Sequence, residues 1–129
     1  MAFKITSEYD KARNGKLKTA HGIIETPFFM PVATKAAMKH LSNDELKNTN
    51  AVITNALLLS LKPGLEVIKH FDGLHKFMNW DKVIFTDSGG FQVLSEFFLE
   101  KTGDSGFYFK SPYDNKKQLL TPEKAIAIQ

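Results

Sequence analysis

A short segment around residue 87 carries the residue types best suited to binding a planar ligand. The run Val83–Phe85 is β-branched and aromatic, which is typical of a buried strand, and Asp87 follows at the end of that strand. Functional side chains of α/β proteins gather at the carboxyl ends of strands. Gly89 and Gly90 have no Cβ, so their backbone can approach a ligand closely, and Phe91 offers a flat aromatic face. The segment therefore predicts a pocket for a planar, hydrogen-bonding molecule.

The same residues also fit ordinary turn chemistry. In this alternative, Asp87 caps the segment that follows it, and Phe91 enters a hydrophobic core. Because a single short motif carries a high false-positive risk, the segment by itself favours the turn. The choice therefore depends on the rest of the chain.

The composition fits one soluble globular domain. The chain has 129 residues, of which 43% are hydrophobic and 24% are charged. It has no cysteine, so it can form neither a disulfide nor a thiolate metal site. The first residues mix acids and bases without a signal-peptide core, and no later segment is long enough to span a bilayer. We therefore expect a cytoplasmic location and no membrane partner.

The charge gives only weak evidence for a nucleic-acid partner. The formal net charge is +3 and the sequence pI is about 9.1, which tolerates a polyanion. Lys35, Lys39 and His40 flank one apolar segment, and Lys116 and Lys117 lie in a predicted turn. Small clusters of this kind are solvated faces more often than phosphate contacts.

The first 26 residues predict an antiparallel hairpin that caps one end of the fold. Phe3 and Ile5 alternate with polar residues, Asn14-Gly15 is typical of a tight hairpin turn, and His21-Gly22 predicts a second turn. The apolar run 27–32, PFFMPV, then predicts the first buried strand.

Strand and helix patterns alternate over the central part of the chain. Ser42 and Glu45 form a capping-box pattern, and 51–54 predicts a buried strand. A helix is predicted from Pro63 to Gly73, and a further amphipathic turn at 74–78 leads to the strand at 83–86. This order is typical of parallel strands joined by crossover helices.

The pattern changes after Phe91. The segments 107–109 and 118–120 predict two short strands joined across 111–115, an inserted β-hairpin near 103–120. Thr121-Pro122 predicts the start of a helix, after which the alternation calls for another strand. The chain therefore looks incomplete, because a parallel (β/α)8 barrel needs about 250 residues and this length supplies about half of one.

Several separated blocks resemble the tRNA-guanine transglycosylases, also called queuine tRNA-ribosyltransferases. The resemblance covers essentially the whole chain, and several blocks in the same order are more specific than any single motif. The blocks are GKLKTAHGIIETPFFMPVAT at 15–34, LKPGLEVI at 61–68, GLHKFMNWDKVIFTDSGGFQV at 73–93 and FKSPYDNKKQLLTPEKAIAIQ at 109–129.

The resemblance implies a fold and a set of site residues. It implies the N-terminal part of a (β/α)8 TIM barrel over 27–129, with 1–26 as its hairpin cap. Asp87 corresponds to the proton acceptor that contacts the pyrimidine edge of the base, and Phe91 to the ring that stacks on it. The loop between them lines the same pocket, and a nearby amide is a hydrogen-bond partner for the acid. The loop residues are Ser88, Gly89 and Gly90, and the amide is that of Asn55. The resemblance implies that all four bind the substrate.

The resemblance also implies an activity and partners. Members of the family are transferases (pentosyltransferases) of queuosine biosynthesis that exchange guanine for a 7-deazaguanine base, queuine or its precursor, at the wobble position of the tRNA anticodon. The implied partners are tRNA, the base and a C-terminal half or partner subunit, and the complete enzyme is implied to be a dimer. The nucleophilic aspartate and a Cys-Cys-Cys-His zinc site lie beyond the matched part, so we expect no metal ligand here and no activity from this chain alone.

Other acids and histidines give no second catalytic group. Asp104 and Asp114 lie in the predicted insertion and fit solvated turns, while the histidines at 21, 40, 70 and 75 lack ligand spacing. Where many bacterial members read Asn-Thr-Tyr-His-Leu, residues 55–59 read Asn-Ala-Leu-Leu-Leu, which keeps Asn55 but removes a hydroxyl and an imidazole. Two rival hypotheses stay open: a non-catalytic accessory or split subunit that binds tRNA, and a small α/β domain for a planar ligand.

Overall fold

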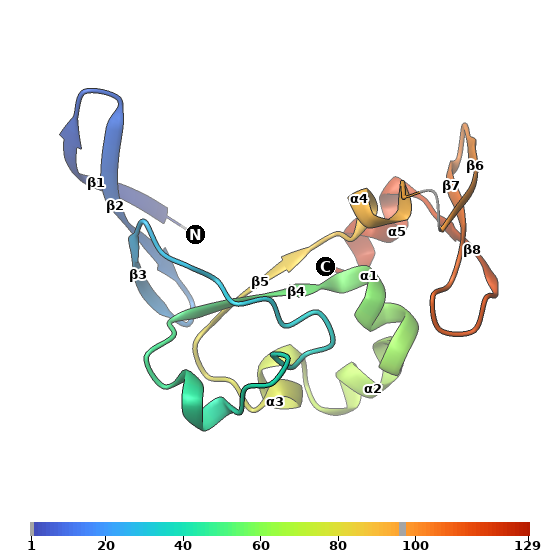
Figure 1. The fold of residues 1–129 in the computed structure, drawn as a ribbon, viewed down its shortest axis with the longest axis horizontal. Helices are drawn as coiled ribbons and strands as arrows, with labels where there is room; N and C mark the ends of the chain where they lie inside the picture. Colours follow the sequence, from blue (N-terminus) through green and yellow to red (C-terminus); the bar gives the residue numbers. More distant parts are fainter. Residues whose placement is uncertain (1, 96–97) are drawn as a thin grey trace.

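The computed structural model describes residues 2–95 and 98–129, which form a mixed α/β structure. Figure 1 shows three sheets following one another across this part of the molecule, with short helices around the central one. In chain order the elements are β1 (Ala2–Tyr9), β2 (Ala12–Thr19), β3 (Gly22–Thr26), η1 (Asn43–Leu46), β4 (Ala51–Asn55), α1 (Ala56–Leu59), η2 (Ser60–Gly64), α2 (Leu65–His70), α3 (Leu74–Met78), β5 (Val83–Asp87), α4 (Gly90–Val93), β6 (Leu99–Gly103), β7 (Gly106–Lys110), β8 (Lys117–Leu120) and α5 (Pro122–Ala127).

The strands β1, β2 and β3 form an antiparallel sheet, but its first turn is not where the sequence placed it. The chain reverses at Asp10, which has a positive φ of 52°, whereas Asn14 and Gly15 lie inside β2. The ring of Phe3 lies over Gly15 and occupies the space that a Cβ would need. The prediction of an Asn14-Gly15 turn was therefore wrong, because this glycine accommodates a ring from the neighbouring strand. The second turn lies at residues 20–21, next to the predicted place.

The predicted strand at 27–32 is also absent from the described structure. This segment makes one parallel bridge, between Val32 and Ile53. The Ala33 amide donates to the Ile53 carbonyl at 2.7 Å, and the Ile53 amide donates to the Pro31 carbonyl at 3.1 Å. Pro27 and Pro31 have no amide hydrogen, so the run cannot supply the regular ladder that its apolar pattern indicated.

The central strands β4 and β5 are parallel, which confirms the predicted arrangement. They pair in register from Ala51 opposite Val83 to Asn55 opposite Asp87, with α1, α2 and α3 in the connection between them. A hydrophobic cluster joins β4 to the loop before η1, to η1 itself, to α3 and to the residues just after α3. Its buried members are Ala33, Met38, Leu46, Val52, Met78 and Trp80.

The third sheet is larger than predicted. It has the order β6-β7-β8 and is antiparallel throughout, so the inserted hairpin near 103–120 is a meander that begins at Leu99. The strand β6 is polar and mostly exposed, which explains why hydrophobic periodicity did not reveal it. Phe109 and Leu120 from this sheet pack against Leu57 of α1 and Val93 of α4. The Thr121 hydroxyl caps α5, as predicted, by accepting from the Lys124 amide.

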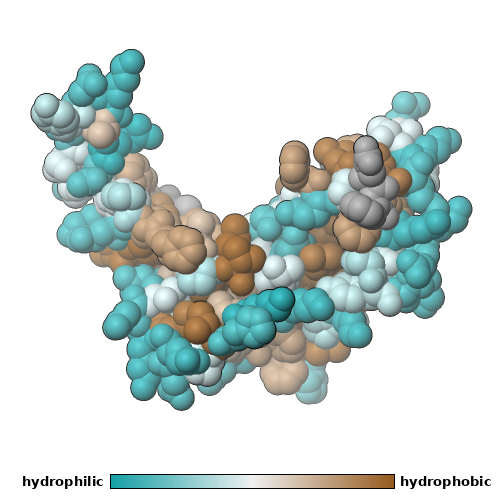
Figure 2. Space-filling model, in the orientation of Figure 1, coloured by the Kyte–Doolittle hydropathy of each residue, from teal (hydrophilic) through white to brown (hydrophobic). Residues whose placement is uncertain are grey.

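The outer sheets leave a hollow between them. Figure 2 shows two arms rising from a broad base on this face of the molecule. One arm is fixed to the base by His21, in the turn before β3, whose ring stacks on His75 of α3 with centroids 3.5 Å apart. Burial, together with the neighbouring His21, lowers the pKa of His75, which favours the neutral form of that ring in the stack. Across the described ranges, no helix is long and apolar enough to cross a membrane.

The central cluster makes a matched prediction about stability. We expect Val52→Ala to lower the free energy of unfolding by about 2 kcal/mol, because it removes two methyl groups from a fully buried site. The same change at Val32, which is 63% exposed, should alter it by less than about 0.5 kcal/mol. Urea unfolding followed by the fluorescence of Trp80, the single tryptophan, measures both changes. Equal effects at the two valines would contradict this description of the core.

Candidate functional site

The site begins where the two parallel strands end. Asp87 is the last residue of β5 and pairs directly with Asn55, the last residue of β4. Side chains at equivalent positions of adjacent parallel strands point to the same face, so the register alone brings the carboxylate and the amide together. Asn55 is buried, at 4% exposure, whereas Asp87 is partly accessible to solvent.

Hydrogen bonds fix both side chains. The Asn55 Oδ1 accepts from the backbone amide of Leu58 at 2.8 Å, which makes Asn55 the N-cap of α1. The Asn55 Nδ2 donates to Asp87 Oδ1 at 3.1 Å, and the Gly89 amide donates to the same oxygen at 2.6 Å. Both bonds reach one carboxylate oxygen. Within the described residues, Asp87 Oδ2 accepts no hydrogen bond from the protein.

The loop after Asp87 is shaped by close packing. Gly89 has a φ of 72°, and a Cβ added there would lie 2.6 Å from the Leu57 Cβ and 2.7 Å from Asn55 Oδ1. The Gly90 amide donates to the Ser88 hydroxyl at 3.3 Å. The turn predicted as the alternative is thus present, because Asp87 accepts from the amide two residues ahead. It is the same turn that leaves the second carboxylate oxygen unbonded.

Phe91 does not enter a core. It lies in α4, and it is 85% exposed. The part of the alternative that placed this ring inside the fold is therefore wrong. An exposed ring is available to a flat ligand, but its stacking on a base remains a prediction.

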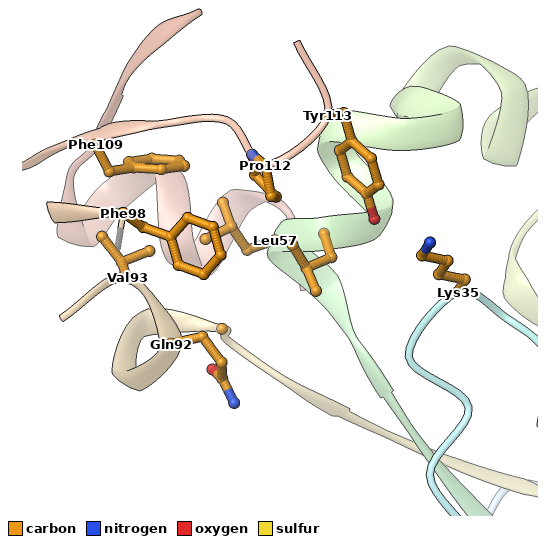
Figure 3. Close-up of a pocket in the computed structure, with 10 residues that line it drawn as sticks. Lys35, Leu57, Gln92, Val93, Phe98, Phe109, Pro112 and Tyr113 are labelled. Carbon is orange, nitrogen blue, oxygen red and sulfur yellow. The ribbon is translucent and has the colours of Figure 1, made fainter. Parts of the chain in front are cut away.

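A cavity borders the same loop, and sequence reasoning missed it. A pocket of about 300 Å³ opens between α1, α4 and the third sheet, and Gly89 contributes to its wall. Figure 3 shows Leu57 near its centre, with Phe98, Phe109 and Val93 on one side and Tyr113 and Lys35 on the other. Its wall residues are Lys35, Leu57, Leu58, Gly89, Gln92, Val93, Phe98, Phe109, Pro112 and Tyr113. They come from four separated stretches of chain, so no local sequence motif predicts the pocket.

The remaining acids and histidines form no second catalytic group in residues 2–95 and 98–129. Asp104 lies exposed in the turn between β6 and β7. Hydrogen bonds from Ser111 and from the Lys116 backbone hold the pKa of Asp114 below its ordinary value, and its carboxylate pairs with Lys116 at 3.3 Å. Both are solvated turn residues, as predicted. No group of three histidine or acidic residues could hold a metal ion in these ranges.

Comparison with known proteins agrees with the motifs. The family model described as queuine tRNA-ribosyltransferase matches residues 8–129. Curated proteins of that name are similar to this chain: one from Natranaerobius thermophilus is 50% identical over 126 residues, covering 96% of this chain and 34% of its own length. Another, from Caldanaerobacter subterraneus subsp. tengcongensis, is 53% identical over 121 residues, covering 92% of this chain and 32% of its own.

A third, from Dehalococcoides mccartyi, is 48% identical over 126 residues and is covered over 32% of its length. The chain thus spans about a third of the length of the curated relatives that it matches. Since the family model covers nearly all of its residues, this chain belongs to the queuine tRNA-ribosyltransferase family.

Proposed function

We propose that this chain supplies the base-recognition acid of a tRNA-guanine transglycosylase. In that reaction guanine is exchanged for a 7-deazaguanine base, queuine or its precursor, at the wobble position of a tRNA anticodon. The proposal is supported by the family match and by the name that the relatives share. The observation that carries it is the carboxylate of Asp87, which is held by one oxygen and keeps the other unbonded within the described structure.

The chemistry of that carboxylate suits a guanine-like edge. Such an edge presents N–H donors, and an ionised carboxylate accepts from them in charge-assisted hydrogen bonds. Asn55 and the Gly89 amide fix Oδ1 in advance, so little orientational freedom is lost when a base binds. Asp87 thereby supplies recognition and an acceptor for a proton of the base. Asn55 touches no base in this proposal and acts as a positioning residue.

The residues after Asp87 complete one side of the pocket. Ser88, Gly89 and Gly90 bring backbone close to the carboxylate, and Phe91 supplies an exposed ring for stacking on the base. Because the target nucleotide is part of an RNA loop, it has to leave its stack to reach this pocket.

The proposed architecture is the first part of a (β/α)8 barrel. The parallel contact of Val32 with Ile53, followed by β4 and β5, gives three chain segments in sequential parallel order. In this proposal β1–β3 cap one end of the barrel, and β6–β8 form the insertion. Asp87 then lies at the carboxyl end of a barrel strand, where catalytic groups of such barrels gather.

The rest of the catalytic apparatus is assigned to another part of the complete protein. Exchange at a glycosidic carbon calls for a nucleophile, and the solvated Asp104 and Asp114 do not fit that role. The residues here also do not fit a zinc site, since the chain has no cysteine and its described part holds no ligand cluster. We therefore propose that the chain acts with a C-terminal part or partner subunit, within a dimer, and is inactive alone.

The first prediction concerns Asp87. When the chain is combined with a fragment carrying the C-terminal two thirds of a relative, exchange of labelled guanine into tRNA should fall about 100-fold for Asp87→Asn, because the charge-assisted acceptor is lost. Asp104→Asn removes a charge from the exposed β6–β7 turn and should leave exchange unchanged. If Asp87→Asn leaves the rate of guanine exchange unchanged, the result would support a non-catalytic accessory subunit instead.

The second prediction concerns Asn55. Asn55→Asp keeps the side-chain shape and the oxygen that caps α1, but it replaces the donor that faces Asp87 by an acceptor. Two carboxylates at that separation share a proton, so the acid side of the pH profile of guanine binding should move to higher pH. Calorimetric titration with guanine from pH 5 to 9 measures the movement. An unchanged profile with simply weaker binding would assign Asn55 a structural role only.

A further inference from the structure

Two lysines lie near one tyrosine of the apolar pocket: Lys35 and Tyr113 line the pocket, and Lys62 approaches the same tyrosine ring. Lys35 lies in the loop before η1, Lys62 in η2, and Tyr113 in the turn between β7 and β8. The ammonium nitrogen of Lys35 is 5.6 Å from the centre of the Tyr113 ring, and that of Lys62 is 5.7 Å from the same point. Three segments that are distant in sequence therefore bring two positive charges to one aromatic ring.

Within residues 2–95 and 98–129, neither ammonium group forms an ion pair with a carboxylate. Asp114, the acid next to Tyr113 in the chain, pairs with Lys116 instead. An ammonium group without a carboxylate partner attracts an anion, and two such groups near one ring add their attraction. The arrangement therefore favours an anionic ligand group beside Tyr113.

The interior of the pocket is suited to a flat apolar group. Phe98, Phe109, Leu57 and Val93 line it, and its volume is about 300 Å³. Burial raises the pKa of Tyr113, so its phenol stays neutral and its ring can act as a stacking surface beside the two charges. An anionic end joined to a flat ring describes a nucleotide, with its phosphate at the lysines and its base among the rings. Figure 3 shows these rings together with Lys35.

The position of the pocket relates it to the proposed base site. Gly89 donates to Asp87 through its amide and also forms part of the pocket wall, so the loop that holds the acid also borders the pocket. Leu57, in the first turn after Asn55, also lines the pocket. A polynucleotide that places one base at Asp87 would therefore pass close to the lysine pair.

We propose that this pocket is a second nucleotide subsite for single-stranded RNA, in which Lys35 and Lys62 hold a phosphate and Tyr113 stacks on the base. The proposal rests on the proposed function, because it takes the RNA to be the substrate whose guanine is exchanged. This subsite would increase the affinity for the RNA through contacts with a nucleotide other than the exchanged guanine.

The test measures RNA binding at several salt concentrations. The 129-residue chain is titrated with a fluorescein-labelled anticodon stem–loop RNA, and log K is plotted against log salt. The double variant Lys35→Ala/Lys62→Ala should bind on the order of tenfold more weakly, with a salt slope less steep by about 0.7 per lysine. Lys69→Ala removes an exposed lysine that is already paired with Glu66, and it should change neither quantity.

The ring is tested separately. Tyr113→Leu should weaken binding about tenfold while leaving the salt slope unchanged, because stacking is lost but no phosphate contact is. Tyr113→Phe keeps the ring and should bind as the wild type does. Circular dichroism of each variant checks that the fold is retained. An unchanged affinity and slope for the lysine double variant, or equal binding by the Leu and Phe variants, would overturn the proposal.

Two further measurements separate the alternatives. Uridine monophosphate tests for a free-nucleotide site. If it binds at the pocket while the lysine double variant binds RNA as the wild type does, the proposed RNA subsite is wrong. Asp87→Asn should weaken binding of free guanine without altering the RNA salt slope. If guanine binding ignores Asp87 but the RNA slope still depends on the lysines, the proposed base site fails and the RNA subsite stands.

Discussion

The candidate site depends on the register of one parallel strand pair. Because Asn55 pairs with Asp87 at the carboxyl ends of β4 and β5, a shift by a single residue would turn one of the two side chains to the opposite face. The burial of β4 makes such a shift costly, since Ala51, Val52 and Thr54 are almost fully buried. The hydrophobic packing of the strand therefore sets the position of a polar pair at its end.

Turn chemistry and functional chemistry are not alternatives in the loop after Asp87. The turn uses one oxygen of the carboxylate, and Asn55 uses the same oxygen. Gly89 must have a positive φ and no side chain for this to happen, because a Cβ would collide with Leu57 and Asn55. The segment that resembles an ordinary turn in sequence thus orients the carboxylate of Asp87.

Sequence patterns predicted the elements whose signals are local. The buried strands at β4 and β5, the helices after Pro63 and Thr121 and the strands β7 and β8 follow from periodicity and caps. The patterns failed where a distant partner decides: Gly15 accommodates a ring from β1, and the prolines in 27–32 prevent a ladder. Asp87, Asn55 and the glycines could be named in advance because they follow recognisable strands. The pocket could not, since Lys35, Leu57, Phe109 and Tyr113 meet only when the loop before η1, α1 and the third sheet have packed together.

The departure at residues 56–58 is explained by the same packing. Many bacterial members of the family carry a hydroxyl, a phenol and an imidazole where this chain has Ala56, Leu57 and Leu58. Here Leu57 is buried against Val93, Phe109 and Leu120, so the first turn of α1 has become part of the core beneath the third sheet. Asn55 does not need the lost polar groups for its orientation. Its Oδ1 accepts from the backbone amide of residue 58, and that amide is present whatever side chain residue 58 carries. In this chain Leu57 therefore places an apolar side chain beside the polar pair, and an apolar surround strengthens its hydrogen bonds.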